Sequence, residues 1–344
     1  MNQDISILII YTGGTIGMVH DPETGALQPL NFRELLTQMP DLKRFGFKLS
    51  TIPFDPPIDS ANIDPVFWIE LAGLIEKNFN EYDGFVVLHG TDTMAFTASA
   101  LSFMLEDLQK PVILTGSQLP IGLLRTDGKE NLVTSIEIAA YKRNEVTVVP
   151  EVCIYFENKL YRGNRTSKYS AEHFNAFRSV NYPTLAEAGL HIRYNYSAIE
   201  YPTIQRKLIV HKKLDNNIAL LKIYPGISEE ILDAILNTKN LKAVVLETFG
   251  SGNAPSESWF INRIKKAIDS GIIILNVSQC FGGSVEMGMY ETSVALRNSG
   301  VISGYDSTTE AALTKLMFLL GQNLSHDEIL KSLNKPIRGE ITIN

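Results

Sequence analysis

The chain has 344 residues, of which 44% are hydrophobic and 20% charged, and its 31 basic and 38 acidic residues give a formal net charge of −7. This length suits two domains, each with a core of its own, and the composition excludes a largely disordered protein. The basic residues are scattered rather than gathered along a stripe that could follow a phosphate backbone, so we expect no nucleic-acid partner.

The N-terminus and the cysteines indicate the compartment. No basic residue precedes the apolar run that begins at Ile5, and this run is too short for a secretory signal. No apolar run approaches the roughly 20 residues that a membrane helix needs, so we expect no membrane partner. Cys153 and Cys280 are the only cysteines, whereas secreted proteins often carry several disulfide pairs. The sequence therefore predicts a soluble, cytoplasmic protein.

Short apolar runs alternate with amphipathic patterns along the chain. The runs predict buried strands at residues 5–11, 85–88, 112–114, 152–156, 218–223, 243–246 and 272–275. Apolar residues three and four positions apart predict helices at residues 66–79, 95–108, 131–141, 229–236 and 259–268. The spacing of a capping box predicts that two C-terminal helices begin at Ser307 with Glu310 and at Ser325 with Glu328. This alternation predicts an α/β fold with parallel sheets.

One irregular stretch divides the chain. Residues 194–217 are polar, contain Pro202 and are rich in lysine, which is typical of a linker. We therefore expect an N-terminal α/β domain of residues 1–193, a linker of residues 194–217 and a C-terminal α/β domain of residues 218–344.

Ligands of open parallel sheets bind beyond the carboxyl ends of the strands, so the turns that follow the strands are candidates for chemistry. After the first strand comes Thr12-Gly13-Gly14-Thr15-Ile16-Gly17, in which the glycines allow a tight turn that exposes the Thr15 hydroxyl. Thr15 is a candidate nucleophile, although an ordinary turn would also explain the pattern. Neither G-x-G-x-x-G nor a glycine-rich loop ending in lysine is present, which disfavours nucleotide binding.

Two further turns carry similar chemistry. The second strand leads into His89-Gly90-Thr91-Asp92-Thr93, which sets a hydroxyl beside a carboxylate, and the third into Thr115-Gly116-Ser117-Gln118. Threonine and aspartate also cap helices, and a histidine in this position is more often a packed residue than a base. One such turn is ordinary, but three at the same edge indicate a site.

A lysine could complete this set. Lys168 follows the strand at residues 152–156, and most lysines are solvated surface residues. If it is buried against Asp92, desolvation would favour its neutral amine, which could then act as a base for a threonine hydroxyl. The six histidines are scattered and form no metal-binding motif, so we expect neither a metal nor a cofactor.

These residues resemble a known family. Thr12-Gly13-Gly14-Thr15-Ile16 and His89-Gly90-Thr91-Asp92-Thr93 resemble the two signature segments of the bacterial-type L-asparaginases, and Asn164-Arg165-Thr166-Ser167-Lys168 resembles their catalytic-lysine segment. The likeness runs nearly end to end and is greatest to the type I, cytoplasmic branch. It implies a larger N-terminal domain with a flavodoxin-like parallel sheet, a smaller C-terminal α/β domain, and assembly as a homodimer or homotetramer.

The resemblance also implies a reaction. Thr15 would attack the side-chain amide of L-asparagine, ammonia would leave, and water would hydrolyse the β-aspartyl ester, with glutaminase activity as a minor side reaction. Thr91, Asp92 and Lys168 would form a polar triad that activates a hydroxyl or the water. The sequence does not decide whether Thr15 or Thr91 is the nucleophile, and we favour Thr15.

The same resemblance assigns the substrate contacts. Asp59, Ser60 and Ala61 match the segment that holds the α-amino and α-carboxylate groups, and Thr91 and Asp92 would also contact the substrate. One departure is the loop at residues 21–29, which lacks the tyrosine that family members use to orient the nucleophile.

Two alternatives remain open, a second enzyme and a protein of a different class. One is the ammonia-releasing subunit of a transfer-RNA amidotransferase, which usually carries an additional N-terminal domain. The other is an amino-acid-binding protein without turnover, for which loss of Asp92 or Lys168 would have been the expected sign.

Overall fold

The computed structural model describes residues 5–20, 27–29, 40–202, 206–288 and 291–343. The chain divides into two compact units, Met1–Lys212 and Lys213–Asn344. The division falls within the stretch 194–217 for which we predicted a linker, but much of that stretch belongs to the N-terminal unit. No helix in the described ranges is both long and apolar enough to cross a bilayer.

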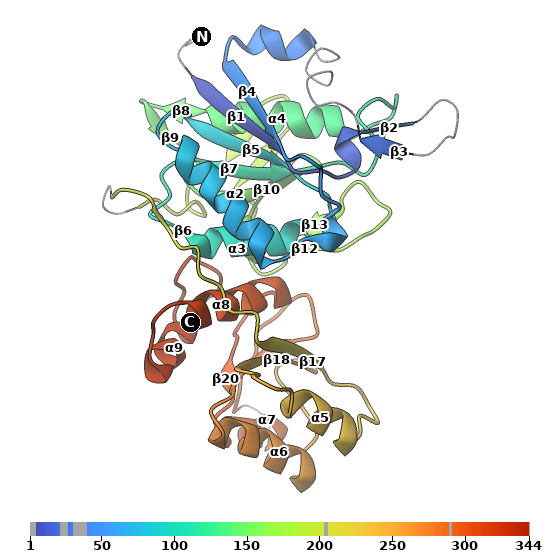
Figure 1. The fold of residues 1–344 in the computed structure, drawn as a ribbon, viewed down its shortest axis with the longest axis vertical. Helices are drawn as coiled ribbons and strands as arrows, with labels where there is room; N and C mark the ends of the chain where they lie inside the picture. The colour runs from blue at the N-terminus through green and yellow to red at the C-terminus, as the bar shows by residue number, and fades with distance from the viewer. Residues whose placement is uncertain (1–4, 21–26, 30–39, 203–205, 289–290, 344) are drawn as a thin grey trace. The chain divides into compact units, whose positions relative to one another are not determined.

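The N-terminal unit is built on an eight-stranded sheet with the strand order β15-β14-β11-β10-β7-β5-β1-β4 (Figure 1). Its five parallel strands are β1 (Ser6–Tyr11), β4 (Lys48–Pro53), β5 (Gly84–Leu88), β7 (Val112–Thr115) and β10 (Val152–Phe156). The other three are β11 (Lys159–Arg162), β14 (Ala186–Ala188) and β15 (Ile192–Tyr194), which pair antiparallel. The predicted parallel sheet is therefore one part of a mixed sheet.

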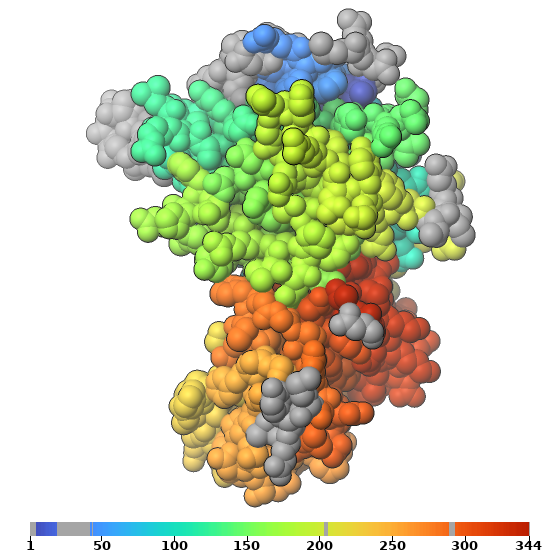
Figure 2. Space-filling view, turned by 180° about the vertical axis from the view of Figure 1, so that it is seen from behind, coloured from blue at the N-terminus to red at the C-terminus, as the bar shows by residue number. Residues whose placement is uncertain are grey.

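The antiparallel part begins at a tight hairpin. Glu157 and Asn158, between β10 and β11, have φ angles of 44° and 64°. Positive φ at both central residues is the backbone of a two-residue turn whose twist matches that of the flanking strands. The chain therefore reverses directly instead of crossing over through a helix. Figure 2 shows the green and yellow-green atoms of the segment from β10 to β15 covering much of one face of this unit.

Helices cover both faces of the sheet. They are α2 (Pro65–Asn78), α3 (Met94–Met104) and α4 (Gly128–Ala140), with α4 opposite α2 and α3 (Figure 1). Ile7 and Ile9 pack in one cluster with Leu132 and Ile136 of α4. Because side chains alternate along a strand, the residues between them, such as Leu8, face the opposite helix layer. Both faces are buried, which explains why β1 is a continuous apolar run.

Short elements complete this unit. The strands are β2 (Met18–His20), β3 (Leu27–Pro29), β6 (Leu105–Glu106), β8 (Lys142–Arg143), β9 (Val146–Thr147), β12 (Ser167–Lys168), β13 (Phe177–Arg178) and β16 (Ile209–Val210). The 3-10 helices are η1 (Thr15–Gly17), η2 (Pro40–Phe45), η3 (Ser60–Asn62) and η4 (Gly163–Arg165).

The C-terminal unit has a parallel sheet of four strands in sequence order. These are β17 (Ile218–Lys222), β18 (Ala243–Thr248), β19 (Ile273–Ser278) and β20 (Ile302–Ser303). Its helices are α5 (Glu229–Leu236), α6 (Ser258–Asp269), α7 (Glu291–Asn298), α8 (Thr309–Gly321) and α9 (His326–Leu333). The predicted two-domain α/β fold is confirmed.

The two predicted capping boxes have different outcomes. Ser325 and Glu328 form the reciprocal capping box that begins α9, as predicted. The prediction for Ser307 is wrong, because α8 begins one residue later with Thr308 as its cap. The Thr308 side chain accepts a hydrogen bond from Ala311 N at 3.1 Å, whereas Ser307 Oγ donates to Thr308 O.

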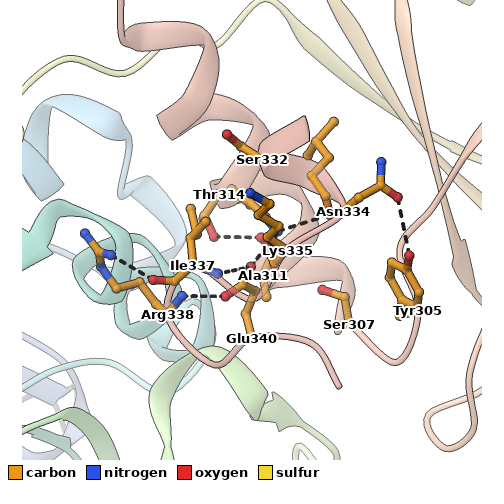
Figure 3. Close-up of polar contacts among 12 residues, drawn as sticks. Tyr305, Ser307, Ala311, Thr314, Ser332, Asn334, Lys335, Ile337, Arg338 and Glu340 are labelled. Carbon is orange, nitrogen blue, oxygen red and sulfur yellow. Dashed lines mark hydrogen bonds and ion pairs between the residues drawn. The ribbon is translucent and has the colours of Figure 1, made fainter. Parts of the chain in front are cut away.

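A buried ion pair fixes the C-terminal segment against α8. Lys315 Nζ lies 2.5 Å from Glu340 Oε1, and the two side chains are 3% and 0% exposed. Figure 3 shows the Glu340 carboxylate accepting hydrogen bonds from the backbone amides of Ile337 and Arg338. Lys315 Nζ also donates to the Lys335 carbonyl at 2.7 Å. Burial lowers the pKa of Lys315, and the Glu340 carboxylate opposes that shift.

We expect Glu340→Gln to lower the free energy of unfolding by about 3 to 5 kcal/mol, because it leaves the Lys315 ammonium buried without a counter-charge. Urea denaturation of the purified protein measures this. Glu257→Gln, at an exposed position of the same unit, is the matched control and should change stability little. Adding Lys315→Met to Glu340→Gln should recover part of the loss, and a Glu340→Gln protein as stable as wild type would contradict the account.

Candidate functional site

Glycines hold three loops together at the carboxyl edge of the N-terminal sheet. Gly14, which follows β1, has a φ of 89°, and a Cβ placed there would lie 2.6 Å from the Cα of Gly90, which follows β5. A Cβ on Gly13 would lie 2.1 Å from the carbonyl oxygen of Ile58, in the loop after β4. Only glycine fits such backbone contacts. The segments that carry Thr15 and Thr91 therefore meet at one edge.

The predicted substrate-binding segment packs into the same junction. A Cβ on Gly90 would lie 2.4 Å from Ser60 Oγ, and Thr93 Oγ1 donates a hydrogen bond to the Ser60 carbonyl at 2.7 Å. Asp59 caps η3 by accepting from Ala61 N at 3.0 Å. Ser60 is buried, whereas Asp59 and Ala61 are exposed. An exposed carboxylate thus stands beside the turn that carries Thr91.

Lys168 joins the two polar side chains of the second turn. Its Nζ donates to Thr91 Oγ1 at 2.9 Å and lies 2.6 Å from Asp92 Oδ1. Lys168 comes 77 positions after Thr91 and 76 positions after Asp92 in the chain. The Lys168 side chain is 18% exposed, whereas that of Asp92 is 66% exposed. The cation is therefore largely withdrawn from water while its carboxylate partner remains accessible.

The backbone around η4 positions Lys168. In β12 it pairs with Phe177 of β13, and Thr166 Oγ1 donates to the Arg162 carbonyl at 2.7 Å. Arg162 itself forms a buried ion pair with Glu151, with its Nε 2.6 Å from Glu151 Oε2. Burial raises the pKa of Glu151, and the Arg162 charge works against that shift. The turn that leads to Lys168 is thus held in place at its first residue, Arg162.

Thr15 is held near Thr91 by the backbone contact between Gly14 and Gly90. It is half-buried at the start of η1, and no hydrogen bond links it to Thr91, Asp92 or Lys168 within the described part of the chain. Tyr11 donates to the Gly17 carbonyl at 3.2 Å, which ties the end of η1 to the end of β1. Burial raises the pKa of Tyr11 to about 12, so it stays protonated. Sequence reasoning missed this contact.

The third turn is described by the structure, whereas most of the tyrosine-free loop at residues 21–29 is not. Residues 21–26 of that loop lie outside the described residues. In the third turn, Ser117 Oγ donates to the Leu119 carbonyl at 2.6 Å and Gln118 Nε2 to the His173 carbonyl at 3.0 Å. Both groups have partners in surrounding backbone, and no hydrogen bond of the described residues joins them to Lys168. The third turn nonetheless packs against the second, since a Cβ on Gly116 would lie 2.4 Å from the His89 carbonyl oxygen.

His89 lies directly beneath the site and is fully buried. Its Nδ1 is 2.6 Å from the Gly90 carbonyl oxygen, and its Nε2 is 2.9 Å from Thr97 Oγ1. Burial lowers the pKa of His89 from 6.5 to about 4, against a smaller opposing effect of the Gly90 contact. At neutral pH the ring is therefore uncharged. No cluster of three or more histidine, cysteine or acidic side chains that could hold a metal occurs among the described residues.

The buried histidine makes stability depend on pH. Because the pKa is lower in the folded state, the unfolded chain takes up this proton first as the pH falls. The contribution is complete above about pH 6.5 and is lost progressively towards about pH 4. From His89 alone we expect the free energy of unfolding to fall by about 2 kcal/mol between about pH 8 and about pH 5. Urea denaturation of wild type and His89→Gln at both pH values isolates this term, and parallel losses in the two proteins would contradict it.

Comparison with known proteins agrees with this geometry. The family model described as "Asparaginase, N-terminal" matches residues 6–200, and "Glutaminase/Asparaginase C-terminal domain" matches residues 217–333. The chain is 45% identical to L-asparaginase 1 of Escherichia coli (strain K12), with 99% of each chain covered. It is 34% identical to a glutamyl-tRNA(Gln) amidotransferase subunit of Pyrococcus abyssi, with 98% of this chain and 76% of that protein covered.

A solved structure extends the comparison to the fold. L-asparaginase I from Vibrio cholerae matches with a TM-score of 0.89 and 42% identity, covering 98% of this chain and 99% of that one. The resemblance inferred from the sequence is confirmed in both domains. Because the likeness extends along nearly the whole chain, this protein belongs to the asparaginase family of amidohydrolases.

Proposed function

We propose that this protein hydrolyses L-asparagine to L-aspartate and ammonia through an ester on Thr15. The observation that supports this most is the double contact of Lys168 Nζ, 2.9 Å from Thr91 Oγ1 and 2.6 Å from Asp92 Oδ1. A hydroxyl, a cation and a carboxylate in direct contact can move the protons that acyl transfer requires. Membership of the asparaginase family points to a side-chain amide as the acyl group.

The first half of the reaction forms the ester. The Thr15 oxygen attacks the side-chain amide carbon and forms the new C–O bond, while the carbonyl becomes a tetrahedral oxyanion. The C–N bond then breaks, and the proton lost by Thr15 leaves with the nitrogen as ammonia. Lys168 donates to the Thr91 oxygen, so the Thr91 proton is free to point at the departing nitrogen. Thr91 and Lys168 would thus relay the proton.

The second half releases the product. A water molecule attacks the ester carbon, the bond to Thr15 breaks, and L-aspartate leaves with the Thr15 hydroxyl restored. The proton of the water passes through the same Thr91–Lys168 pair to the departing Thr15 oxygen, and Asp92 compensates the charge of the lysine. Atoms therefore balance as one amide and one water in, and one carboxylic acid and one ammonia out.

The oxyanion would be stabilised by backbone amides before α3. Within the described residues no acceptor is bound to the N–H groups of Thr91 and Asp92, which lie just ahead of the first residue of α3, Met94. Free amides at the start of a helix favour negative charge. A pair of such donors aimed at the developing oxyanion is the arrangement that accelerates acyl transfer most.

The head of the substrate fits the acidic side of the site. Asp59 accepts only one described hydrogen bond, from Ala61 N, and the Asp92 side chain is largely exposed. Two carboxylates close to the same turn favour a ligand with an α-ammonium group. We propose that Asp59, Ser60 and Ala61 hold the amino-acid head, with Thr91 and Asp92 as further contacts, and that glutamine is a poorer substrate.

Three accompanying proposals follow from the family resemblance. They are a cytoplasmic location, assembly as a homodimer or homotetramer, and catalysis without a cofactor. The amidotransferase alternative is the weaker one, because identity to the protein from Pyrococcus abyssi is 34% against 45% for the Escherichia coli enzyme. A binding protein without turnover would not need the contact between Lys168 and Thr91.

The nucleophile is tested by ammonia release from L-asparagine and L-glutamine. We expect Thr15→Val to lower kcat by at least about 10³-fold, because it removes the attacking oxygen. Thr91→Val should slow both half-reactions yet leave some ester formation. Thr184→Val, at a half-buried position outside the site, is the matched control. A Thr15→Val enzyme with near-normal activity, beside an inactive Thr91→Val, would transfer the role to Thr91.

The proton relay is tested at Lys168. We expect Lys168→Met to lower kcat by about 10² to 10⁴-fold, the usual contribution of a general acid or base, with a smaller change in KM. Lys168→Arg should not restore the rate, because a guanidinium does not give up its proton. Lys159→Met, at an exposed position of β11, controls for loss of a lysine. Full activity of Lys168→Arg would show that charge alone suffices.

A further inference from the structure

A chain of buried hydrogen bonds runs from α2 to the turn that carries Thr91. Trp68 Nε1 donates to Thr97 Oγ1 at 3.0 Å, and Thr97 Oγ1 lies 2.9 Å from His89 Nε2. His89 Nδ1 in turn lies 2.6 Å from the Gly90 carbonyl oxygen. Trp68, Thr97 and His89 are 5%, 0% and 0% exposed. The chain is therefore shielded from water over its whole length.

The chain has only one consistent direction. An indole N–H is a donor alone, so the Thr97 oxygen accepts from Trp68 and turns its own proton towards His89 Nε2. A carbonyl oxygen only accepts, so His89 Nδ1 must carry the proton that faces Gly90. Both ends thus require the same neutral tautomer, in which Nε2 accepts and Nδ1 donates. Every donor in the series points towards the Gly90 carbonyl.

The Gly90 carbonyl and the Thr91 N–H belong to the same peptide group. We propose that His89 is a positioning residue that polarises this peptide and thereby strengthens the Thr91 N–H as a donor to the oxyanion. Withdrawing electron density at the carbonyl oxygen increases the positive charge on the amide hydrogen, because the two are coupled by amide resonance. This inference rests on the proposed hydrolysis, in which that N–H faces the developing charge.

The surroundings of the His89 ring favour the neutral tautomer in which Nδ1 donates to the Gly90 carbonyl. The described neighbours of the ring are uncharged: the Thr97 hydroxyl, the Gly90 carbonyl and the edge of Phe67, whose ring centroid is 6.0 Å away. Burial lowers the pKa of His89 to about 4, so the neutral tautomer persists in the pH range of an ordinary hydrolase. Buried hydrogen bonds in series polarise one another more than solvated ones.

The expected size follows from known magnitudes. Removing a whole oxyanion donor costs about 10² to 10³ in kcat, and each bond in a series strengthens the next by about 10 to 30%. Applying that fraction to the logarithm of the rate effect gives a loss of about two- to eight-fold in kcat when the His89 contact is removed. The KM for L-asparagine should change little, because the amide gains its extra donor strength where charge develops.

The test compares wild type with His89→Gln, His89→Phe and Thr97→Val. Glutamine carries a donor group and an acceptor group, as the neutral imidazole does, so it should restore most of the rate that phenylalanine loses. Thr97→Val shortens the chain and should give a smaller loss of the same kind. Thr314→Val, which removes another fully buried hydroxyl but in α8, is the matched control and should leave kcat unchanged.

A second readout separates this role from general destabilisation. The aldehyde analogue of the substrate, L-aspartate β-semialdehyde, forms an adduct with the nucleophile that carries the oxyanion, whereas the product L-aspartate does not. We expect its inhibition constant to rise in His89→Phe and Thr97→Val by the same factor as kcat falls, while binding of L-aspartate stays unchanged.

The outcomes distinguish this inference from the function beneath it. Unchanged kcat in both His89→Phe and Thr97→Val would overturn the inference alone. An equal weakening of the binding of the aldehyde and of L-aspartate would also overturn it, because that result indicates a purely structural role. If His89→Phe does not fold, Thr97→Val decides by the same criteria. A folded wild type that releases no ammonia would overturn the proposed function together with the inference.

Discussion

The contact between the backbones of Gly14 and Gly90 is the constraint on which the site depends. These residues lie in the loops after β1 and β5, and a Cβ on Gly14 would lie 2.6 Å from the Cα of Gly90. Strands in a parallel sheet are set about 4.8 Å apart, so side chains on both loops would force their tips away from each other. Two facing glycines let the loops touch. The hydroxyls of Thr15 and Thr91 follow directly on each side of this contact.

At this edge of the sheet, the charged residues lie at an upper level near the surface and the uncharged residues at a buried lower level. At the surface, Asp92 and Asp59 keep exposed carboxylates, and Lys168 faces Asp92 and Thr91 from a largely buried position. Beneath them, His89 and Thr97 are fully buried and uncharged. Burying an unpaired charge at the lower level would be costly, whereas neutral hydrogen bonds there hold the turn in place. The accessible charged groups are therefore confined to the upper level.

Much of this architecture could be predicted from the sequence, and the exceptions have physical causes. All of the predicted strands are present, and most of them are continuous apolar runs because both of their faces are buried. β4 was missed because it is a half-buried edge strand that mixes polar and apolar residues and forms no continuous apolar run. The antiparallel hairpin after β10 was missed because its turn uses Glu157 and Asn158, not glycine. The cap of α8 was placed one residue too early because the capping-box spacing selects Ser307 with Glu310, whereas the actual cap, Thr308, has Ala311 at that spacing.

Some features of the site, too, could be predicted from the sequence, whereas others could not. Turns that contain glycine are easy to recognise in a sequence, so the segments that carry Thr15 and Thr91 could be predicted. Lys168 also contacts Asp92, as our hypothesis required. The hydrogen-bonded chain that leads to His89 could not be predicted from the sequence, because Thr97 and Trp68 lie on two different helices. They come close to His89 only in the folded protein.

The central claim is that Thr15 carries the acyl group, and the most direct measurement is to find that group on the chain. Wild type and Lys168→Met, in which hydrolysis of the ester should be slower, would be quenched in acid during turnover of L-asparagine and mapped by peptide mass spectrometry. The account predicts the added mass of one β-aspartyl group on the peptide that contains Thr15. The same mass on the peptide that contains Thr91, with Thr15 unmodified, would contradict it.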